Sequence, residues 1–413
     1  MPYQPTTNFK DSNNVDLGKK LVTKDYLLSV YGTILENTGQ TGLTVTPVLW
    51  SWGAFFTQFA QLGTNSGSPS STPVTTFAGG SNWKEVSCGY EHAVAIKTDG
   101  TLWTWGRNNA GQLGNNNTTN VSTPVTTFLG GTNWKTCAGG YRYCAAIKTD
   151  GTLWTWGRNA YGQLGINNTT QKNTPVTTFA GGTNWKKVAC ANGAGEHIVA
   201  IKTDGTLWTW GLNGSGSLGI NNISTDKYTP VTTFAGGNNW KDISCSYHTV
   251  AIKTDGTLWL WGYDNGYNQL GQNATTSEKI TPVTTFAGGN NWKTCAAGSF
   301  HTVAIKTDGT LWAWGQNGGG YLGDGTVINR STPITTNLGG TNWKTCVASY
   351  RNTAAIKTDG TLWVWGTNTY IALGINSTVT PYSPITTFLG GTNWKSISTN
   401  TDWMSGIQSQ AYI

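Results

Sequence analysis

One ten-residue string constrains this chain more than any other feature of its sequence. KTDGTLWTWG occurs three times unchanged and three times with one substitution, at Lys97–Gly106, Lys148–Gly157, Lys202–Gly211, Lys253–Gly262, Lys306–Gly315 and Lys357–Gly366. The first tryptophan of its Leu-Trp-x-Trp-Gly core recurs every 51 to 54 residues, at positions 50, 103, 154, 208, 259, 312 and 363. A period of this length predicts a repeat architecture, which lets 413 residues fold without one oversized core.

Each repeat predicts four short strands. In the unit that follows Trp83, these are VSCG (86–89), HAVAIK (92–97), TLWTWG (101–106) and PVTTF (124–128). The Asp-Gly pair between the second and third strands predicts a type I′ hairpin turn. Seven four-stranded units predict an all-β fold, a seven-bladed β-propeller.

The two ends of the repeat array predict how the ring closes. The first unit begins with an orphan LWSWG (49–53), and the last unit stops at 406–409 without a KTDG hairpin. Joining them completes one blade, with two inner strands from the C-terminus and two outer strands from residues 45–77. We therefore expect a propeller over residues 43–413 and a separate N-terminal segment over residues 1–42.

The repeat motif also resembles a known family. HTVAIKTDGTLWLWG (248–262), HTVAIKTDGTLWAWG (301–315) and NNAGQLG (108–114) are similar to the regulator of chromosome condensation repeat. The resemblance implies a seven-bladed propeller but no single function, since its members include a nucleotide exchange factor for Ran, a plant ultraviolet photoreceptor and a β-lactamase inhibitor. This chain has no long inserted wedge and no basic tail. GYEHA (89–93) and GSFHT (298–302) replace the photoreceptor's Gly-Trp-Arg-His-Thr, so we expect neither exchange nor photoreception.

Composition excludes several classes of protein. Only 11% of residues are charged while 22 are tryptophan, which argues against disorder. The net charge of +7 is spread without a Lys/Arg run, so we expect no nucleic-acid partner. No apolar stretch approaches a membrane span and no signal peptide is evident, so we expect no membrane insertion. The seven cysteines form no CxxC pair, which favours small buried side chains over metal ligands or disulfides.

The sequence offers no catalytic constellation, and we expect no enzyme, no cofactor and no metal. It lacks a P-loop, an H-E-x-x-H motif, a G-x-S-x-G motif and a dinucleotide fingerprint. The four histidines, His92, His197, His248 and His301, fall at one position of separate repeats, where a structural hydrogen bond is the favoured role. The paired tryptophans lie two residues apart on one face of a strand, which predicts packing between blades.

The N-terminal segment leads to our main functional hypothesis. Residues 15–35 predict a short helix that begins after Thr23, and the segment resembles the attachment segment of virion proteins from tailed phages, especially cyanophages. The expected docking residues are Leu21, Tyr26, Leu27, Val30, Tyr31 and Ile34. We therefore expect a non-enzymatic virion structural protein of the tail, baseplate or capsid surface, located in the virion. Residues 1–42 would bind other virion proteins, and the propeller would recognise the host surface.

The alternative is a cellular scaffold or inhibitor that binds another protein. Under either hypothesis, recognition is expected on the face where the repeats differ, which carries the long loops between the third and fourth strands. This face is rich in Asn, Thr, Ser, Gly and Tyr, which suit adaptable binding of a protein or a glycan, although solvated connectors would look the same. The candidate recognition residues are Arg107, Asn108, Asn117, Tyr161, Asn168, Asn213, Tyr228, Tyr263, Asp264, Tyr267, Tyr321, Arg330, Tyr370 and Tyr382.

Overall fold

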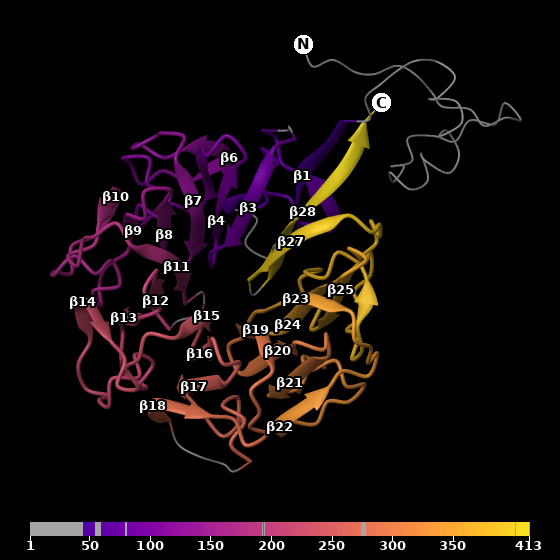
Figure 1. Ribbon diagram of the computed structural model, residues 1–413. Coiled ribbons are helices and arrows are strands. Elements are labelled where there is room, and N and C mark those ends of the chain that lie inside the picture. Colours follow the sequence, from indigo (N-terminus) through magenta and orange to yellow (C-terminus); the bar gives the residue numbers. More distant parts are fainter. Residues whose placement is uncertain are drawn as a thin grey trace, which may run out of the picture. The chain divides into compact units, whose positions relative to one another are not determined.

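The structure is a computed structural model that describes residues 44–412 except 54–58, 79–80, 192, 194, 274–277 and 401. Its described residues contain no α-helix and form 28 strands in seven four-stranded antiparallel sheets (Figure 1). The propeller occupies one compact unit, Pro47–Gln408. The helix expected within residues 15–35 and its six docking residues lie outside the described residues.

The strands of each blade run outward from the channel in the expected order. The innermost strands are β3 (Trp83–Cys88), β7 (Trp134–Gly139), β11 (Trp185–Cys190), β15 (Trp240–Cys245), β19 (Trp292–Ala297), β23 (Trp343–Ala348) and β27 (Trp394–Thr399). The second strands are β4 (His92–Lys97), β8 (Tyr143–Lys148), β12 (His197–Lys202), β16 (His248–Lys253), β20 (His301–Lys306), β24 (Asn352–Lys357) and β28 (Trp403–Tyr412).

The third strands carry the tryptophan pairs, and the fourth strands form the rim. The third strands are β5 (Leu102–Gly106), β9 (Leu153–Gly157), β13 (Leu207–Gly211), β17 (Leu258–Gly262), β21 (Leu311–Gly315), β25 (Leu362–Gly366) and β1 (Thr44–Gly53). The fourth strands are β6 (Val121–Thr126), β10 (Lys172–Thr177), β14 (Lys227–Thr232), β18 (Lys279–Thr284), β22 (Arg330–Thr335), β26 (Ile385–Thr386) and β2 (Ser70–Thr75).

The tryptophan pairs have the architectural role that their spacing predicts. Trp105 is fully buried and belongs to a cluster that also contains Leu49 and Trp403 of the neighbouring blade. Its indole Nε1 donates to the carbonyl of Gln61 at 2.9 Å, in the loop of that same neighbour. Trp103 is half-buried and lies under the ammonium of Lys97, 4.3 Å from its ring centre. Neither ring is an open stacking platform, so the pairs hold adjacent blades together.

The hairpin turn differs from the type I′ turn that Asp-Gly predicted. Only Gly100 has a positive φ, of 80°, whereas a type I′ turn needs positive φ at both central residues. Gly100 N donates to Lys97 O at 3.0 Å, and Lys97 N donates to Thr101 O at 3.0 Å. This is the pattern of a type I turn followed by a glycine bulge. The Asp99 carboxylate accepts from Thr101 N and Oγ1 at 2.9 and 2.7 Å, so it stabilises the turn.

The ring closes as the orphan strands predict. The closing sheet has the order β2-β1-β28-β27, so strands from the two ends of the chain share one blade. Within it, the hydroxyls of Ser51 and Ser405 lie 2.7 Å apart across β1 and β28. Because β1 and β28 pair with each other, neither strand is left as an open edge of a sheet.

Candidate functional site

Antiparallel order divides the connections of the propeller between two faces. The KTDG hairpins and the turns from each fourth strand to the next blade lie together on one face, which we call the hairpin face. The turns between innermost and second strands, and the loops between third and fourth strands, lie on the opposite face, the loop face. The register of β5 with β4 and β6 fixes this division, since Gly106 pairs with both His92 and Val121 at the loop face.

Four predicted recognition residues are buried, and two of them hold their loops together instead of lining the surface. The four are Asn108, Asn213, Asp264 and Tyr321, all less than 10% exposed. Asn108 Oδ1 accepts from Leu113 N at 2.9 Å, and its Nδ2 donates to Asn117 O at 3.0 Å. Asn213 makes the same contacts with Leu218 and Asn222. A buried asparagine thus holds each of these two loops in place. The sequence alone could not distinguish these buried asparagines from the exposed ones in the same loops.

The other predicted recognition residues lie at or near the surface of the loops. Asn117, Asn168, Tyr228 and Tyr382 are exposed, while Arg107, Tyr161, Tyr263, Tyr267, Arg330 and Tyr370 are half-buried. They come from the loops of several blades. Tyr263 and Tyr267 lie in one loop, and both pack against the ring of Phe300.

The strongest grouping on the loop face involves residues that the sequence analysis missed. Five short turns between innermost and second strands each carry one half-buried aromatic residue: Tyr90, Tyr141, Tyr247, Phe300 and Tyr350. The ring centres of Tyr247 and Phe300 lie 5.4 Å apart with planes only 10° from parallel, and Tyr350 meets Phe300 at 5.5 Å. We call these five residues the aromatic cluster. The sequence did contain a signal for this cluster, namely one aromatic residue in each of these turns, just before the histidine position.

The aromatic cluster forms two groups around the loop-face end of the channel. Tyr90 and Tyr141 form the first pair, with ring centres 4.7 Å apart. The Tyr247, Phe300 and Tyr350 rings form the second group, which Tyr263 and Tyr267 extend. Guanidinium groups lie over their outer members: Arg142 is 5.0 Å from the Tyr141 ring and Arg351 is 4.7 Å from the Tyr350 ring. Such stacked arginine and tyrosine side chains are the types that dominate protein–protein contacts.

Charged groups beside the aromatic cluster are mostly paired. Glu91 and Glu196 form ion pairs with Arg107 and Arg158, and burial raises the pKa of Glu196. Burial also raises the pKa of Asp402 to about 7, although the positive charge of Arg351 opposes the shift. This face therefore combines apolar rings with a few partly desolvated charges, which suits specific contact with a protein surface.

The histidines have the structural role that their repeat position predicts. His197, His248 and His301 are fully buried, and each Nε2 lies 2.7 to 2.9 Å from a threonine hydroxyl of the next blade. His92 makes the equivalent contact with Cys144 Sγ at 3.1 Å. Burial lowers the pKa of these imidazoles to about 3 or 4. All seven cysteines are buried and unbridged, as predicted.

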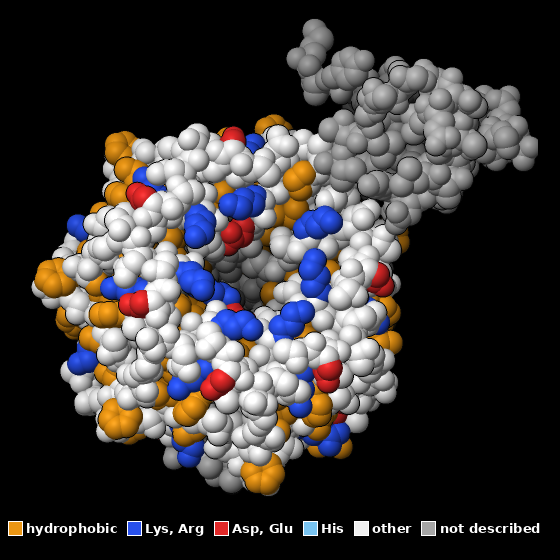
Figure 2. All heavy atoms as spheres, viewed as in Figure 1, with side chains coloured by type: hydrophobic (Ala, Val, Ile, Leu, Met, Phe, Trp, Pro, Cys, Tyr) orange, Lys and Arg blue, Asp and Glu red, His pale blue; other side chains and the backbone are white. Residues whose placement is uncertain are grey.

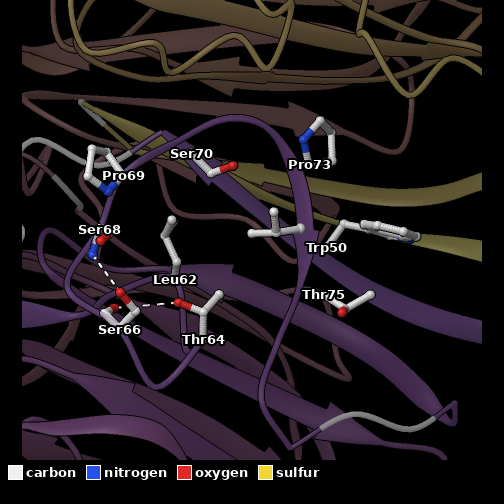
Figure 3. Close-up of a pocket in the computed structure, with 10 residues that line it drawn as sticks. Trp50, Leu62, Thr64, Ser66, Ser68, Pro69, Ser70, Pro73 and Thr75 are labelled. Carbon is white, nitrogen blue, oxygen red and sulfur yellow. Dashed lines mark hydrogen bonds between the residues drawn. The ribbon is translucent and has the colours of Figure 1, made fainter. Parts of the chain in front are cut away.

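A separate cavity of about 540 Å³ lies in the closing blade (Figure 3). Trp50, Leu62 and Pro73 supply its apolar wall, and Ser66, Ser68 and Thr64 supply hydroxyl groups. Within this loop, Thr64 Oγ1 donates to the backbone carbonyl of Ser66 at 3.4 Å, and the Ser68 backbone N–H donates to Ser66 Oγ at 3.0 Å. None of the described residues that line the cavity has a titratable side chain.

The part of the chain that the structure describes contains no group of three or more His, Cys, Asp or Glu side chains placed to hold a metal ion. Within those same residues, no helix has the length and apolar character needed to cross a bilayer.

Comparison with known proteins identifies the repeat. The family described as "Regulator of chromosome condensation (RCC1) repeat" matches residues 48–96, 99–147, 150–200, 204–252, 255–305 and 308–356. The ultraviolet-B receptor of Arabidopsis thaliana is 30% identical over 341 residues, which cover 80% of this chain and 76% of that protein. The mitochondrial RCC1 domain-containing protein RUG3 of the same plant is 29% identical over 301 residues, covering 70% and 66%.

Solved structures agree on the fold. Yeast RCC1 (Prp20) bound to Kap60 superposes with a TM-score of 0.75 at 17% identity, covering 99% of this chain and 97% of that one. Human WBSCR16 also gives 0.75, at 19% identity, covering 87% and 99%.

These comparisons overturn the virion hypothesis. The relatives above are cellular proteins, and their similarity extends along the propeller. The family match begins at residue 48, so it does not reach the short segment that suggested a phage tail, baseplate or capsid protein. The prediction of a virion protein with virion partners and a location in the virion was wrong. It rested on a short N-terminal resemblance, whereas the repeats, which make up most of the chain, belong to cellular proteins.

Proposed function

The chain belongs to the regulator of chromosome condensation repeat family, and we propose that it is a non-enzymatic, protein-binding propeller that engages its partner through the aromatic cluster. The observation that carries this proposal is the grouping of Tyr247, Phe300 and Tyr350 beside Arg351 at the loop face. Packed aromatic rings with adjacent arginine are the usual centre of a protein interface.

The loops around the cluster support a preorganised surface. Buried amides such as Asn108 and Asn317 hold the loops between third and fourth strands with several hydrogen bonds each. A surface whose loops are already ordered loses less conformational entropy when it binds. Among relatives of the same fold, yeast Prp20 has been solved with Kap60 and studied for binding to Gsp1p and histones. Those partners are properties of that protein, and the present proposal is limited to a protein partner.

The proposal is tested by placing a photo-crosslinking phenylalanine analogue at position 300 in cells that express the chain. We expect a discrete protein adduct from this position, identified by mass spectrometry. The matched control places the same analogue at Phe286, which is 65% exposed on the hairpin face. The purified partner should then bind Phe300→Ala at least about 30-fold more weakly than Phe286→Ala, which corresponds to a typical aromatic hot spot of about 2 kcal/mol. Equal adducts from both positions would contradict a loop-face site.

A further inference from the structure

The hairpin face carries a feature that the protein-binding proposal does not use. The second residue of every innermost strand is an exposed lysine, in seven blades out of seven: Lys84, Lys135, Lys186, Lys241, Lys293, Lys344 and Lys395. We call them the lysine ring. Figure 2 shows basic side chains, drawn in blue, gathered around the central hollow on the face in view.

A β-bulge presents each lysine of the ring. In the first full blade, Trp83 pairs with Lys97 and Glu85 pairs with Ile96, so Lys84 is the extra residue without a partner. The same register shift occurs at this point in all seven innermost strands. Bulges of this kind re-aim a side chain at the end of a sheet. Lys84 Nζ donates to the backbone carbonyl of Lys135 at 3.2 Å, so this ammonium group lies beside the backbone of the next ring position.

Packing does not account for these lysines. The tryptophans beside them are covered by the hairpin lysines, as when Lys97 lies 4.9 Å from the Trp83 ring. The residue that follows the ring lysine varies among Glu, Thr, Lys, Asp and Ser in the seven units, whereas the ring position is always lysine. Any polar residue would solvate an exposed bulge, and seven like charges around one opening repel each other. The presence of lysine at all seven positions therefore indicates that positive charge is required at this opening.

The charge at this opening is largely uncompensated. Lys187 forms an ion pair with Asp242 of the next blade, so these two charges neutralise each other. With that pair set aside, the described innermost strands carry the seven ring lysines and one carboxylate, Glu85. The difference is six positive charges. Glu85 is itself engaged, since it accepts from Thr136 Oγ1 at 2.7 Å in the next blade. The seven innermost strands together carry a net charge of +6, whereas the rest of the chain carries a net charge of only +1.

From this geometry we propose that the lysine ring binds a compact, multiply phosphorylated anion, such as an inositol polyphosphate, at the hairpin-face opening of the channel. Lysine supplies point charge for phosphate without fixing direction, and a ring with near-sevenfold symmetry suits an anion whose charge is distributed around a centre. A single-stranded nucleic acid needs exposed aromatic platforms as well as charge. The exposed phenylalanines of the hairpin face follow the fourth strands at the rim of the propeller, away from the innermost strands that carry the lysine ring. The rings nearest the lysine ring, Trp83 and Trp103, are buried or covered by Lys97.

Calorimetry of the full chain with inositol hexakisphosphate at 0.15 M salt tests the proposal. We expect one anion per chain. The triple variant Lys135→Gln, Lys293→Gln and Lys344→Gln removes three ring charges and should weaken binding on the order of 100-fold. A matched triple variant, Lys172→Gln, Lys227→Gln and Lys279→Gln, removes three charges from strand ends at the loop face and should bind like the unchanged protein.

Thermal unfolding separates loss of the site from loss of the fold. The anion should raise the unfolding temperature of the unchanged protein and the loop-face triple variant, but hardly that of the ring triple variant. Without anion, the ring variant should unfold at the same temperature or higher, because charge repulsion is relieved. Absence of binding, several anions per chain, or equal weakening in both triple variants would overturn the proposal. Because the site lies on the opposite face, the crosslinking outcome at Phe300 does not affect this test.

Discussion

Replacing one buried histidine with asparagine should make the fold less sensitive to acid. His301 is fully buried, and its Nε2 lies 2.9 Å from Thr353 Oγ1, which in turn donates to Tyr321 O at 2.8 Å. Because the Thr353 hydroxyl donates its proton to Tyr321 O, it can only accept from the imidazole, so His301 Nε2 carries a proton and donates it to Thr353 Oγ1. The Nδ1 atom has no hydrogen-bond partner, and burial lowers the pKa of the ring to about 3 from 6.5.

The sign and size of the effect follow from proton linkage. Because the pKa of the folded state is depressed, the full stability is present above 6.5 and is lost as the pH falls toward 3. At pH 5.0 the unfolded imidazole is protonated while the folded one stays neutral. The loss from pH 7.5 to 5.0 is therefore about 1.5 pH units at 1.36 kcal/mol each, or about 2 kcal/mol per histidine. Asp402 acts in the opposite direction, since its pKa is raised to about 7 and acid relieves its buried charge.

This opposition makes a variant comparison sharper than the total pH dependence. His301→Asn is a substitution that the chain itself provides, because Asn352 occupies the same strand position in the next blade and accepts from Thr399 Oγ1 at 2.9 Å. Urea unfolding at pH 7.5 and 5.0 should show the variant losing about 2 kcal/mol less than the unchanged protein. Lys279→Gln serves as a control and should keep the original difference. If His301→Asn loses as much stability as the unchanged protein, the linkage argument is refuted.

Three other perturbations test the architecture. Gly256→Ala should lower the free energy of unfolding by at least about 2 kcal/mol, because φ is +82° and a Cβ would meet Asn290 O at 2.0 Å. Position 318 faces open space, so Gly318→Ala should change the free energy of unfolding by less than about 0.5 kcal/mol in the same urea titration. Trp210→Ala should cost about 3–5 kcal/mol, since the buried ring and its 2.9 Å bond to Gln163 O join two blades; a smaller loss would contradict that role. Deleting residues 1–35 should leave the thermal midpoint within about 1 °C, and cooperative loss of the propeller would refute the proposed division of the chain.

The repeats predicted the fold because every structural requirement recurs seven times. Blade number, strand order, ring closure and the roles of the tryptophan pairs and histidines all follow from positions that repeat in register. The hairpin turn was predicted less well, because Asp-Gly suits both a two-residue type I′ turn and the turn that is found, a type I turn over Thr98 and Asp99 followed by Gly100 with positive φ. Which loop residues are exposed was also out of reach. Asn108 and Asn117 look alike in sequence, but one is the buried anchor of the other's loop.

The aromatic cluster shows a different limit. Tyr247, Phe300 and Tyr350 lie in turns of two or three residues, where no hydrophobic period can signal them. Only the radial arrangement of blades brings side chains about 50 residues apart in sequence into ring contact. The long loops differ most between repeats and were therefore the expected site of recognition, whereas the aromatic residues of the short turns nearly repeat and did not stand out.

Internal identity between repeats is therefore informative only when burial is known. Trp83 and Trp105 recur because packing requires them, but the lysine ring and a second set of exposed residues recur without that reason. The second set follows each fourth strand and consists of Phe77, Phe128, Phe179, Phe234, Phe286 and Phe388, each 63–65% exposed. The remaining unit has Asn337 there, and its N–H donates to Gly323 O at 2.8 Å just as Phe234 N donates to Gly219 O.

This exception predicts that the exposed phenylalanines contribute little to folding. Because the backbone bond is the same with either side chain, Phe234→Asn should change the free energy of unfolding by less than about 1 kcal/mol, measured by urea titration beside Trp210→Ala. A loss of 3 kcal/mol or more would show that the exposed ring is part of the packing after all. A small change would place these phenylalanines with the lysine ring, as repeated residues whose reason lies at the surface of the hairpin face.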